Sequence, residues 1–141
     1  MSQNETDRGP ANSHALSVFA DLSPVAWATR AHAHILGKTM VGCALMTDNG
    51  RIFSGCNVEH QFRSHDVHAE VNAISSMAAA GERKISFLLV VAERARFTPC
   101  GACMDWIMQF AGEPCIIGFQ ADPGGSFTLY RADELMPYYP H

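Results

Sequence analysis

The feature that most constrains the fold is the segment from Ile85 to Glu93, which reads ISFLLVVAE. It is an apolar run of strand length, and it lacks the alternation of apolar and polar residues that marks a strand with one solvated face. A strand of this kind has to be covered on both faces. The run therefore predicts the central strand of a sheet that lies between layers of helices.

Four further segments have the pattern of strands. Residues 40–58, MVGCALMTDNGRIFSGCNV, contain two short apolar runs around Asn49-Gly50, a pair that tolerates the backbone angles of a tight hairpin turn. The runs PCIIGFQ (114–120) and SFTLY (126–130) are joined by the turn signal ADPGG. Together with the central run they predict five strands.

Helices are predicted in the segments between these strands. In SPVAWATRAHAHILG (23–37), Ser23 is a candidate N-cap, Pro24 stands at the first helical position and Gly37 is a stop signal. The Ala-rich segment HAEVNAISSMAAAGE (68–82) has apolar residues at helical spacing and ends at Gly81. A third helix follows the loop at TPCGAC, with an expected buried stripe that consists of Ala102, Trp106, Ile107 and Phe110. The end RADELMPYYPH predicts a short helical turn and a tail.

The length of 141 residues corresponds to about one domain. Residues 1–14 are polar and contain Gly9 and Pro10, so we expect a disordered N-terminal tail followed by a single domain over residues 15–141.

The charge pattern restricts the partners. Ten basic and fourteen acidic side chains give a formal net charge of −4, and no block of Lys and Arg could follow a phosphate backbone, so we expect no nucleic-acid partner. No segment reaches the ~20 apolar residues of a membrane span, and the start of the chain lacks the pattern of a signal peptide. We therefore expect a cytoplasmic protein without a membrane partner.

The five cysteines are an odd number for a disulfide framework, and metal ligation or core packing explains them better. Cys43, Cys56 and Cys115 lie in apolar contexts and are predicted to be core residues. Trp27 and Trp106 are likewise predicted to pack in the core. For His32, His34 and His65 we expect surface or packing roles.

The candidate metal-binding pattern consists of His68, Cys100 and Cys103. Imidazole and thiolate are ligands that hold zinc, and the Cys-x-x-Cys spacing lets two thiolates in one helical turn reach the same ion. The N-terminus of a helix also stabilises thiolate anions. Three protein ligands leave the fourth tetrahedral position open, which is typical of a catalytic rather than a structural zinc site.

Glu70 has two interpretations. An acidic residue in the first turn of a helix is favoured by the helix dipole in any case, so it could be an ordinary surface residue. It also lies two residues after His68, close enough to act as a general acid and base at the open position of the metal. Alone, Cys-x-x-Cys could be a redox pair or part of a closed zinc site; together the motifs form the H-x-E…P-C-x-x-C pattern of zinc-dependent deaminases.

With these motifs the chain resembles the cytidine deaminase family. The similarity runs from about Val41 to Pro137 and includes, in order, VGCAL, GRIFSGCNVE, HAE…AI, TPCGAC and ELMP. The resemblance implies a three-layer α/β/α fold with a five-stranded mixed sheet. It also implies hydrolytic deamination of cytidine, deoxycytidine or a close aminopyrimidine nucleoside, with release of ammonia, as expected for a hydrolase of pyrimidine salvage.

The same resemblance assigns roles to individual residues. His68, Cys100 and Cys103 would hold Zn²⁺, and Glu70 would carry the proton from water to the pyrimidine ring nitrogen and then to the departing ammonia. Asn57 and Glu59 would bind the ribose hydroxyls, and their spacing in a strand puts both side chains on one face; otherwise they are a solvated strand end. Ala69 and Thr98 would also bind substrate. The resemblance implies a homo-oligomer, either a tetramer or a dimer.

Two departures from the family keep alternatives open. Nucleoside deaminases commonly have an aromatic residue just before VG, where this chain has Thr39 and Met40, and the C-terminal segment is shortened to MPYYPH, where Tyr138 or Tyr139 could substitute. The first alternative is a deaminase of an aminoacyl-nucleoside antibiotic of the blasticidin S type. The second is a non-catalytic zinc-binding module on the same fold, which would have no use for Glu70.

Overall fold

The computed structural model describes residues 3–4, 10–95 and 97–140. Its sheet has the strand order β1-β6-β5-β4-β2-β3, in which β4 and β5 are parallel and all other neighbouring pairs are antiparallel. The strands are β1 (Gln3–Asn4), β2 (Gly42–Thr47), β3 (Ile52–Cys56), β4 (Ile85–Val91), β5 (Ala111–Gln120) and β6 (Phe127–Arg131). The helices are α1 (Pro10–Arg30), α2 (Ala69–Ala79), α3 (Gly101–Phe110) and α4 (Ala132–Leu135), with a 3-10 turn over Arg63–His65.

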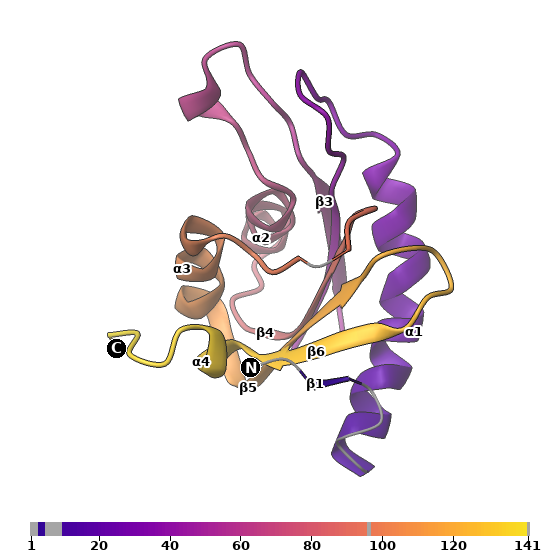
Figure 1. Ribbon diagram of the computed structural model, residues 1–141. Helices are drawn as coiled ribbons and strands as arrows, with labels where there is room; N and C mark the ends of the chain where they lie inside the picture. Colours follow the sequence, from indigo (N-terminus) through magenta and orange to yellow (C-terminus); the bar gives the residue numbers. More distant parts are fainter. Residues whose placement is uncertain (1–2, 5–9, 96, 141) are drawn as a thin grey trace.

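The sheet lies between two helical layers (Figure 1). Helix α1 covers one face, and α2 and α3 cover the other. Strand β4 is buried on both sides: Leu89 packs in the core under α1, whereas Leu88 and Val90 pack in the core under α2 and α3. The predicted central strand and the mixed three-layer fold are confirmed. All five predicted strands are present, and the two-residue β1 extends the sheet beyond β6.

The N-terminal region differs from the prediction. Helix α1 begins at Pro10 and ends at Arg30, so Pro24 lies inside the helix and Gly37 lies beyond it. The predicted disordered tail over residues 1–14 is wrong where the structure describes it, since 3–4 form β1 and 10–14 belong to α1; residues 1–2 and 5–9 lie outside the described residues. The helix starts earlier than predicted because an apolar stripe on one of its faces runs from before Pro24 to beyond it. Its buried members are Ala15, Val18, Phe19, Leu22 and Ala26.

The buried stripe of α3 is also different from the predicted one. Ile107 is buried as expected, but Ala102 is exposed and Trp106 has 46% of its surface exposed. The buried side chains of this helix are Cys103, Met104, Ile107 and Met108. The helix is therefore rotated so that Cys103 faces inward, and Trp106, predicted to be a core residue, lies on its outer side.

Two glycines position the hairpin and the helix after it. Gly50 has a φ of +79° in the turn between β2 and β3, as the Asn-Gly pair predicted. At Gly55, a Cβ atom would lie 2.5 Å from the backbone nitrogen of Ala73 and 2.6 Å from the carbonyl oxygen of Ala69. Only glycine permits so close an approach, which brings the start of α2 directly against the end of β3.

Candidate active site

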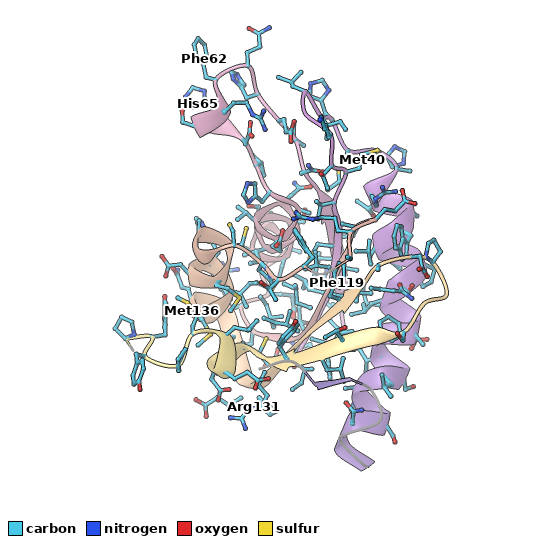
Figure 2. All side chains as sticks on the ribbon, viewed as in Figure 1. Met40, Phe62, His65, Phe119, Arg131 and Met136 are labelled. Atoms are coloured by element: carbon cyan, nitrogen blue, oxygen red, sulfur yellow. The ribbon has the colours of Figure 1, made fainter. Side chains whose placement is uncertain are left out.

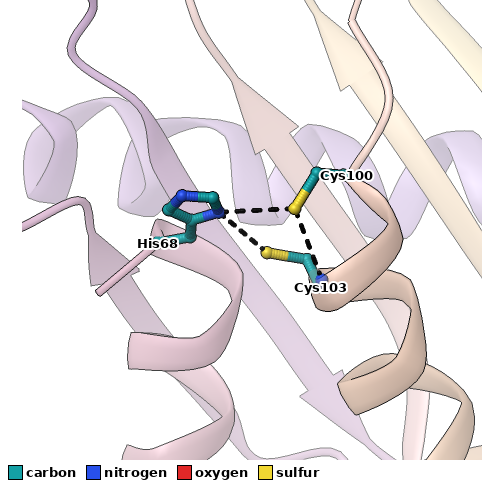
Figure 3. Close-up of side chains that lie close together, drawn as sticks. All are labelled: His68, Cys100 and Cys103. Carbon is teal, nitrogen blue, oxygen red and sulfur yellow. Dashed lines mark hydrogen bonds between the residues drawn. The ribbon is translucent and has the colours of Figure 1, made fainter. Parts of the chain in front are cut away.

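The start of α2 and the start of α3 lie side by side on the same face of the sheet (Figure 3). His68 is the N-cap residue of α2, Cys100 is the N-cap residue of α3, and Cys103 lies in the first turn of α3. The sequence predicted these three candidate ligands at helix starts, and their positions in the helices are confirmed. The Cys100 sulfur accepts a hydrogen bond from the backbone N–H of Cys103, so it acts as a helix cap as well.

The three ligand atoms form a small triangle. His68 Nδ1 lies 3.3 Å from the Sγ atom of Cys103 and 3.5 Å from the Sγ atom of Cys100, and all three atoms lie within 4.8 Å of one another. Tetrahedral zinc, with bonds of about 2.3 Å to sulfur and 2.0 Å to nitrogen, separates a nitrogen and a sulfur ligand by roughly 3.5 Å. The donor atoms and their spacing therefore fit zinc, and they leave the fourth position open.

The charges at this centre support the same conclusion. Burial raises the pKa of the Cys103 thiol, and the Glu70 carboxylate and the Cys100 thiolate raise it further. Three anionic groups so close together repel one another unless a cation neutralises them, and a thiol that coordinates zinc is deprotonated outright. The site is thus built for a bound cation.

Glu70 is not a surface residue, because only 2% of its surface is exposed. Burial raises the pKa of its carboxyl group, while its own backbone N–H, nearby His68 and a hydrogen bond with Cys103 act in the opposite direction. A carboxyl buried next to the metal ligands can accept and return a proton, and this rules out the surface interpretation of Glu70.

A cavity of about 540 Å³, a size typical of small-molecule sites, opens onto His68 and Cys100. It brings together every predicted site residue except Cys103, whose sulfur faces the ligand triangle. The predicted residues that line it are Asn57, Glu59, His68, Ala69, Glu70, Thr98 and Cys100. Among the other lining residues, Thr39 stands where the family commonly has an aromatic residue. No role was predicted for the rest, which are Val41, Arg63, Asp66, Arg94 and Phe97.

The side chains of Asn57 and Glu59 also bind the protein backbone. Asn57 accepts a hydrogen bond from the N–H of Val41 at 2.9 Å and donates one to the carbonyl of Thr39 at 2.9 Å. Glu59 Oε1 accepts from the N–H groups of Leu36 and Gly37 at 2.7 and 2.8 Å. The pair therefore holds the segment 36–41 as one wall of the cavity.

A second loop, residues 58–67, carries Arg63 and Asp66 at the cavity. Arg63 forms ion pairs with Glu59 at 3.2 Å and with Asp66 at 2.8 Å, and Asp66 accepts a hydrogen bond from the N–H of His60 at 2.7 Å. Figure 2 shows Phe62 and His65 of this loop projecting away from the body of the molecule. These contacts lie within the loop itself, between residues three to six positions apart, and they fix its conformation beside the cavity.

The remaining cysteines and histidines match their predictions where the structure describes them. Cys43, Cys56 and Cys115 are buried, and burial raises the pKa of each thiol. His32, His34 and His65 are exposed. Trp27 is half-buried, and its indole N–H donates a hydrogen bond to the buried Gln120.

Comparison with known proteins agrees with this geometry. Residues 20–119 match the family model described as the cytidine and deoxycytidylate deaminase zinc-binding region. A cytidine deaminase of Mycoplasma genitalium is 30% identical over 98 residues, which cover 68% of this chain and 74% of that protein. A cytidine deaminase of Sporosarcina psychrophila is 38% identical over 74 residues, and this alignment covers 52% of the chain and about half, 54%, of that relative.

The fold has a counterpart among solved structures. The crystal structure of a cytidine deaminase from Burkholderia pseudomallei superposes with a TM-score of 0.78 at 29% sequence identity, covering 86% of this chain and 98% of the other. Within the described part of the chain, no helix combines the length and the apolar character that crossing a bilayer requires.

Proposed function

Because the chain belongs to the cytidine and deoxycytidylate deaminase zinc-binding family, we propose that it is a zinc-dependent hydrolase that converts cytidine, deoxycytidine or a close aminopyrimidine nucleoside into the uridine product and ammonia. The observation that carries this proposal is the buried carboxyl group of Glu70, next to the three metal ligands and in the wall of the cavity.

His68, Cys100 and Cys103 would hold the zinc ion. Zinc lowers the pKa of a water molecule to about 7 and so provides a nucleophile at neutral pH. Glu70 accepts the proton that water loses and passes it to the ring nitrogen next to the reacting carbon. A bond forms between the water oxygen and C4 of the ring. Glu70 then takes the second proton from the new C4 hydroxyl and gives it to the exocyclic nitrogen, the bond from C4 to this nitrogen breaks, and ammonia leaves as the C4 carbonyl forms.

The chain orients the nucleoside through the cavity walls. Asn57 and Glu59 bind ribose hydroxyls with the hydrogen-bonding capacity that their backbone contacts leave available, because each amide and carboxylate oxygen has two lone pairs. Ala69 and Thr98 line the same cavity next to Glu70 and Cys100, and they contact the pyrimidine ring.

Two alternatives are less well supported. A non-catalytic zinc module gains nothing from a carboxyl group that is buried at the cost of its desolvation beside an open metal position. A deaminase of a blasticidin-type antibiotic shares the chemistry, and the absence of an aromatic residue at Thr39 and Met40 is its main support. Assembly as a tetramer or dimer, a cytoplasmic location and a role in pyrimidine salvage stay predictions.

The decisive experiment is a substrate panel with the zinc-loaded protein. Cytidine, deoxycytidine, N4- and C5-substituted cytidines and blasticidin S are incubated separately, and ultraviolet absorbance and ammonia release are recorded. We expect equal amounts of ammonia and uridine product from cytidine or deoxycytidine. Turnover of the antibiotic alone would favour the first alternative, and no turnover of any compound at full zinc occupancy would favour the non-catalytic module.

A further inference from the structure

The charged side chains that line the cavity differ in whether they form an ion pair. Glu59 and Asp66 share the guanidinium group of Arg63, so this cation is already neutralised by two carboxylates. Glu70 is buried and lies against His68 and Cys103. Among the described residues, the other charged side chain in the lining is that of Arg94, in the loop between β4 and α3.

Arg94 is exposed, and it forms no ion pair with any carboxylate among residues 3–4, 10–95 and 97–140. Its guanidinium carbon lies 4.9 Å from the centre of the Phe97 ring, which lines the same cavity. This cation–π contact holds the group near the cavity without using its N–H donors on a protein acceptor. The neighbouring Glu93 instead forms an ion pair with Arg30, at 2.9 Å.

A guanidinium with unused donors in a substrate cavity is suited to an anion that has two oxygen atoms. Its planar donors match phosphate and carboxylate groups in a bidentate arrangement. The stacked Phe97 ring limits the rotamers of the side chain, so less entropy is lost when the anion binds. No neutral nucleoside has a group of this kind.

We propose that Arg94 is a specificity-determining residue that binds an anionic substituent on the sugar of the substrate, so that this cavity prefers a nucleotide or another 5′-acidic nucleoside over the neutral nucleoside. The inference rests on the proposed function, because that function sets the orientation of the substrate. In that function Asn57 and Glu59 hold the sugar, and Arg94 lines the same cavity of about 540 Å³ as these two residues.

The test is a binding measurement that needs no turnover. Isothermal titration of the zinc-loaded protein with uridine, uridine 5′-monophosphate and uridine 5′-carboxylate compares three unreactive product ligands that differ at one carbon. We expect the acidic ligands to bind at least tenfold more tightly than uridine. The ranking of the two separates phosphate from carboxylate as the preferred anion, and added salt weakens the preference.

Three variants assign the preference to a residue. Arg94→Gln should reduce the ratio of the affinities for acidic and neutral ligands to less than threefold, and Arg94→Lys should keep part of it. Arg83→Gln is the matched control, because Arg83 lies outside the cavity and its guanidinium donates to the carbonyls of Ala78 and Glu82. This control should have the wild-type ratio. Zinc content and circular dichroism verify that each variant is folded.

The outcomes separate this inference from the function on which it rests. If cytidine is deaminated but the acidic ligands bind no better than uridine, or if Arg94→Gln keeps their advantage, the inference is wrong and the proposed function stands. If no ligand binds and no aminopyrimidine is deaminated at full zinc occupancy, the proposed function fails and the inference fails with it.

Discussion

The floor and the rim of the cavity are held by different kinds of contact. The floor consists of His68, Glu70 and Cys100, together with Cys103, which contacts His68 without lining the cavity. These residues lie at the starts of α2 and α3, two helices that pack against the sheet through buried apolar side chains. The rim consists of segments 36–41 and 57–67, which are joined by hydrogen bonds from backbone N–H groups to the side chains of Asn57 and Glu59. The ion pairs of Arg63 hold the second segment together.

This difference divides the residues needed for the reaction from the residues that select the substrate. Groups on packed helices keep the positions that proton transfer and metal binding need, whereas loops held by polar contacts can change without disturbing the core. We therefore expect substitutions in the floor to abolish turnover and substitutions in the rim to change substrate binding or local stability.

The largest effect is expected from Cys103→Ser. A hydroxyl is a poor replacement for a buried thiolate ligand, so the variant should lose most of its zinc and all measurable deamination. Metal content is measured by atomic emission, and activity by the fall in cytidine absorbance. Cys115→Ala is the control, because Cys115 is buried away from the cavity and should leave the zinc content at the wild-type level. Full zinc occupancy in Cys103→Ser would exclude Cys103 as a ligand.

Glu70→Gln should lower the rate of deamination without removing the zinc ion. The amide has nearly the same shape but cannot shuttle a proton, so kcat should fall by roughly 10²–10⁴-fold while zinc remains bound. Glu113→Gln, which removes an exposed carboxylate outside the cavity, should keep wild-type kcat. Glu70 would not be the acid and base if Glu70→Gln turned over cytidine at more than a tenth of the wild-type rate.

A smaller effect is expected for Asn57→Ala in the rim. The loss of hydrogen bonds to the sugar and to the segment 36–41 should lower kcat/KM for cytidine by about 1–3 kcal/mol, with zinc content unchanged. Steady-state kinetics with cytidine measure this effect. Unchanged kcat/KM would mean that Asn57 does not contact the substrate and that the wall does not depend on it.

The smallest effect is expected for Glu59→Gln, and it depends on pH. Hydrogen bonds from the Gly37 and Leu36 N–H groups hold the pKa of Glu59 below its usual value, with Arg63 acting in the same direction. A lowered folded-state pKa stabilises the protein above the unfolded pKa of about 4.3, and this stabilisation is lost as the pH falls through the folded value. The Tm of Glu59→Gln should thus lie below that of wild type at pH 7, and the gap should close in acid.

Thermal unfolding at a series of pH values measures this gap. Glu113→Gln serves again as the control, since its side chain forms no ion pair with the residues that the structure describes, and its Tm should follow that of wild type. A gap for Glu59→Gln that is the same at pH 7 and pH 4 would show that the charge of Glu59 does not hold the rim.

The parts of the molecule that the sequence predicted depend on local rules. The hairpin at Asn49-Gly50, the central strand and the starts of α2 and α3 follow from turn chemistry, apolar runs and helix punctuation within about ten residues. The same local rules misplaced the start of α1, because Ser23 and Pro24 imitate a helix start. Burial of the longer stripe from Ala15 to Ala26 against the sheet outweighs this local signal.

The sequence by itself therefore determined the chemistry: a histidine and two cysteines at helix starts, a glutamate two residues after the histidine, and a sheet that carries them. Only the tertiary structure decided that His68 and Cys103 lie 3.3 Å apart, that Glu70 is buried, and which groups complete the cavity. The physical reason is the distance along the chain over which each effect acts. Capping and periodicity act over a few residues, whereas the contact of His68 with Cys103 and the place of Arg94 in the cavity lining depend on how distant segments pack. Such packing leaves no pattern along the chain.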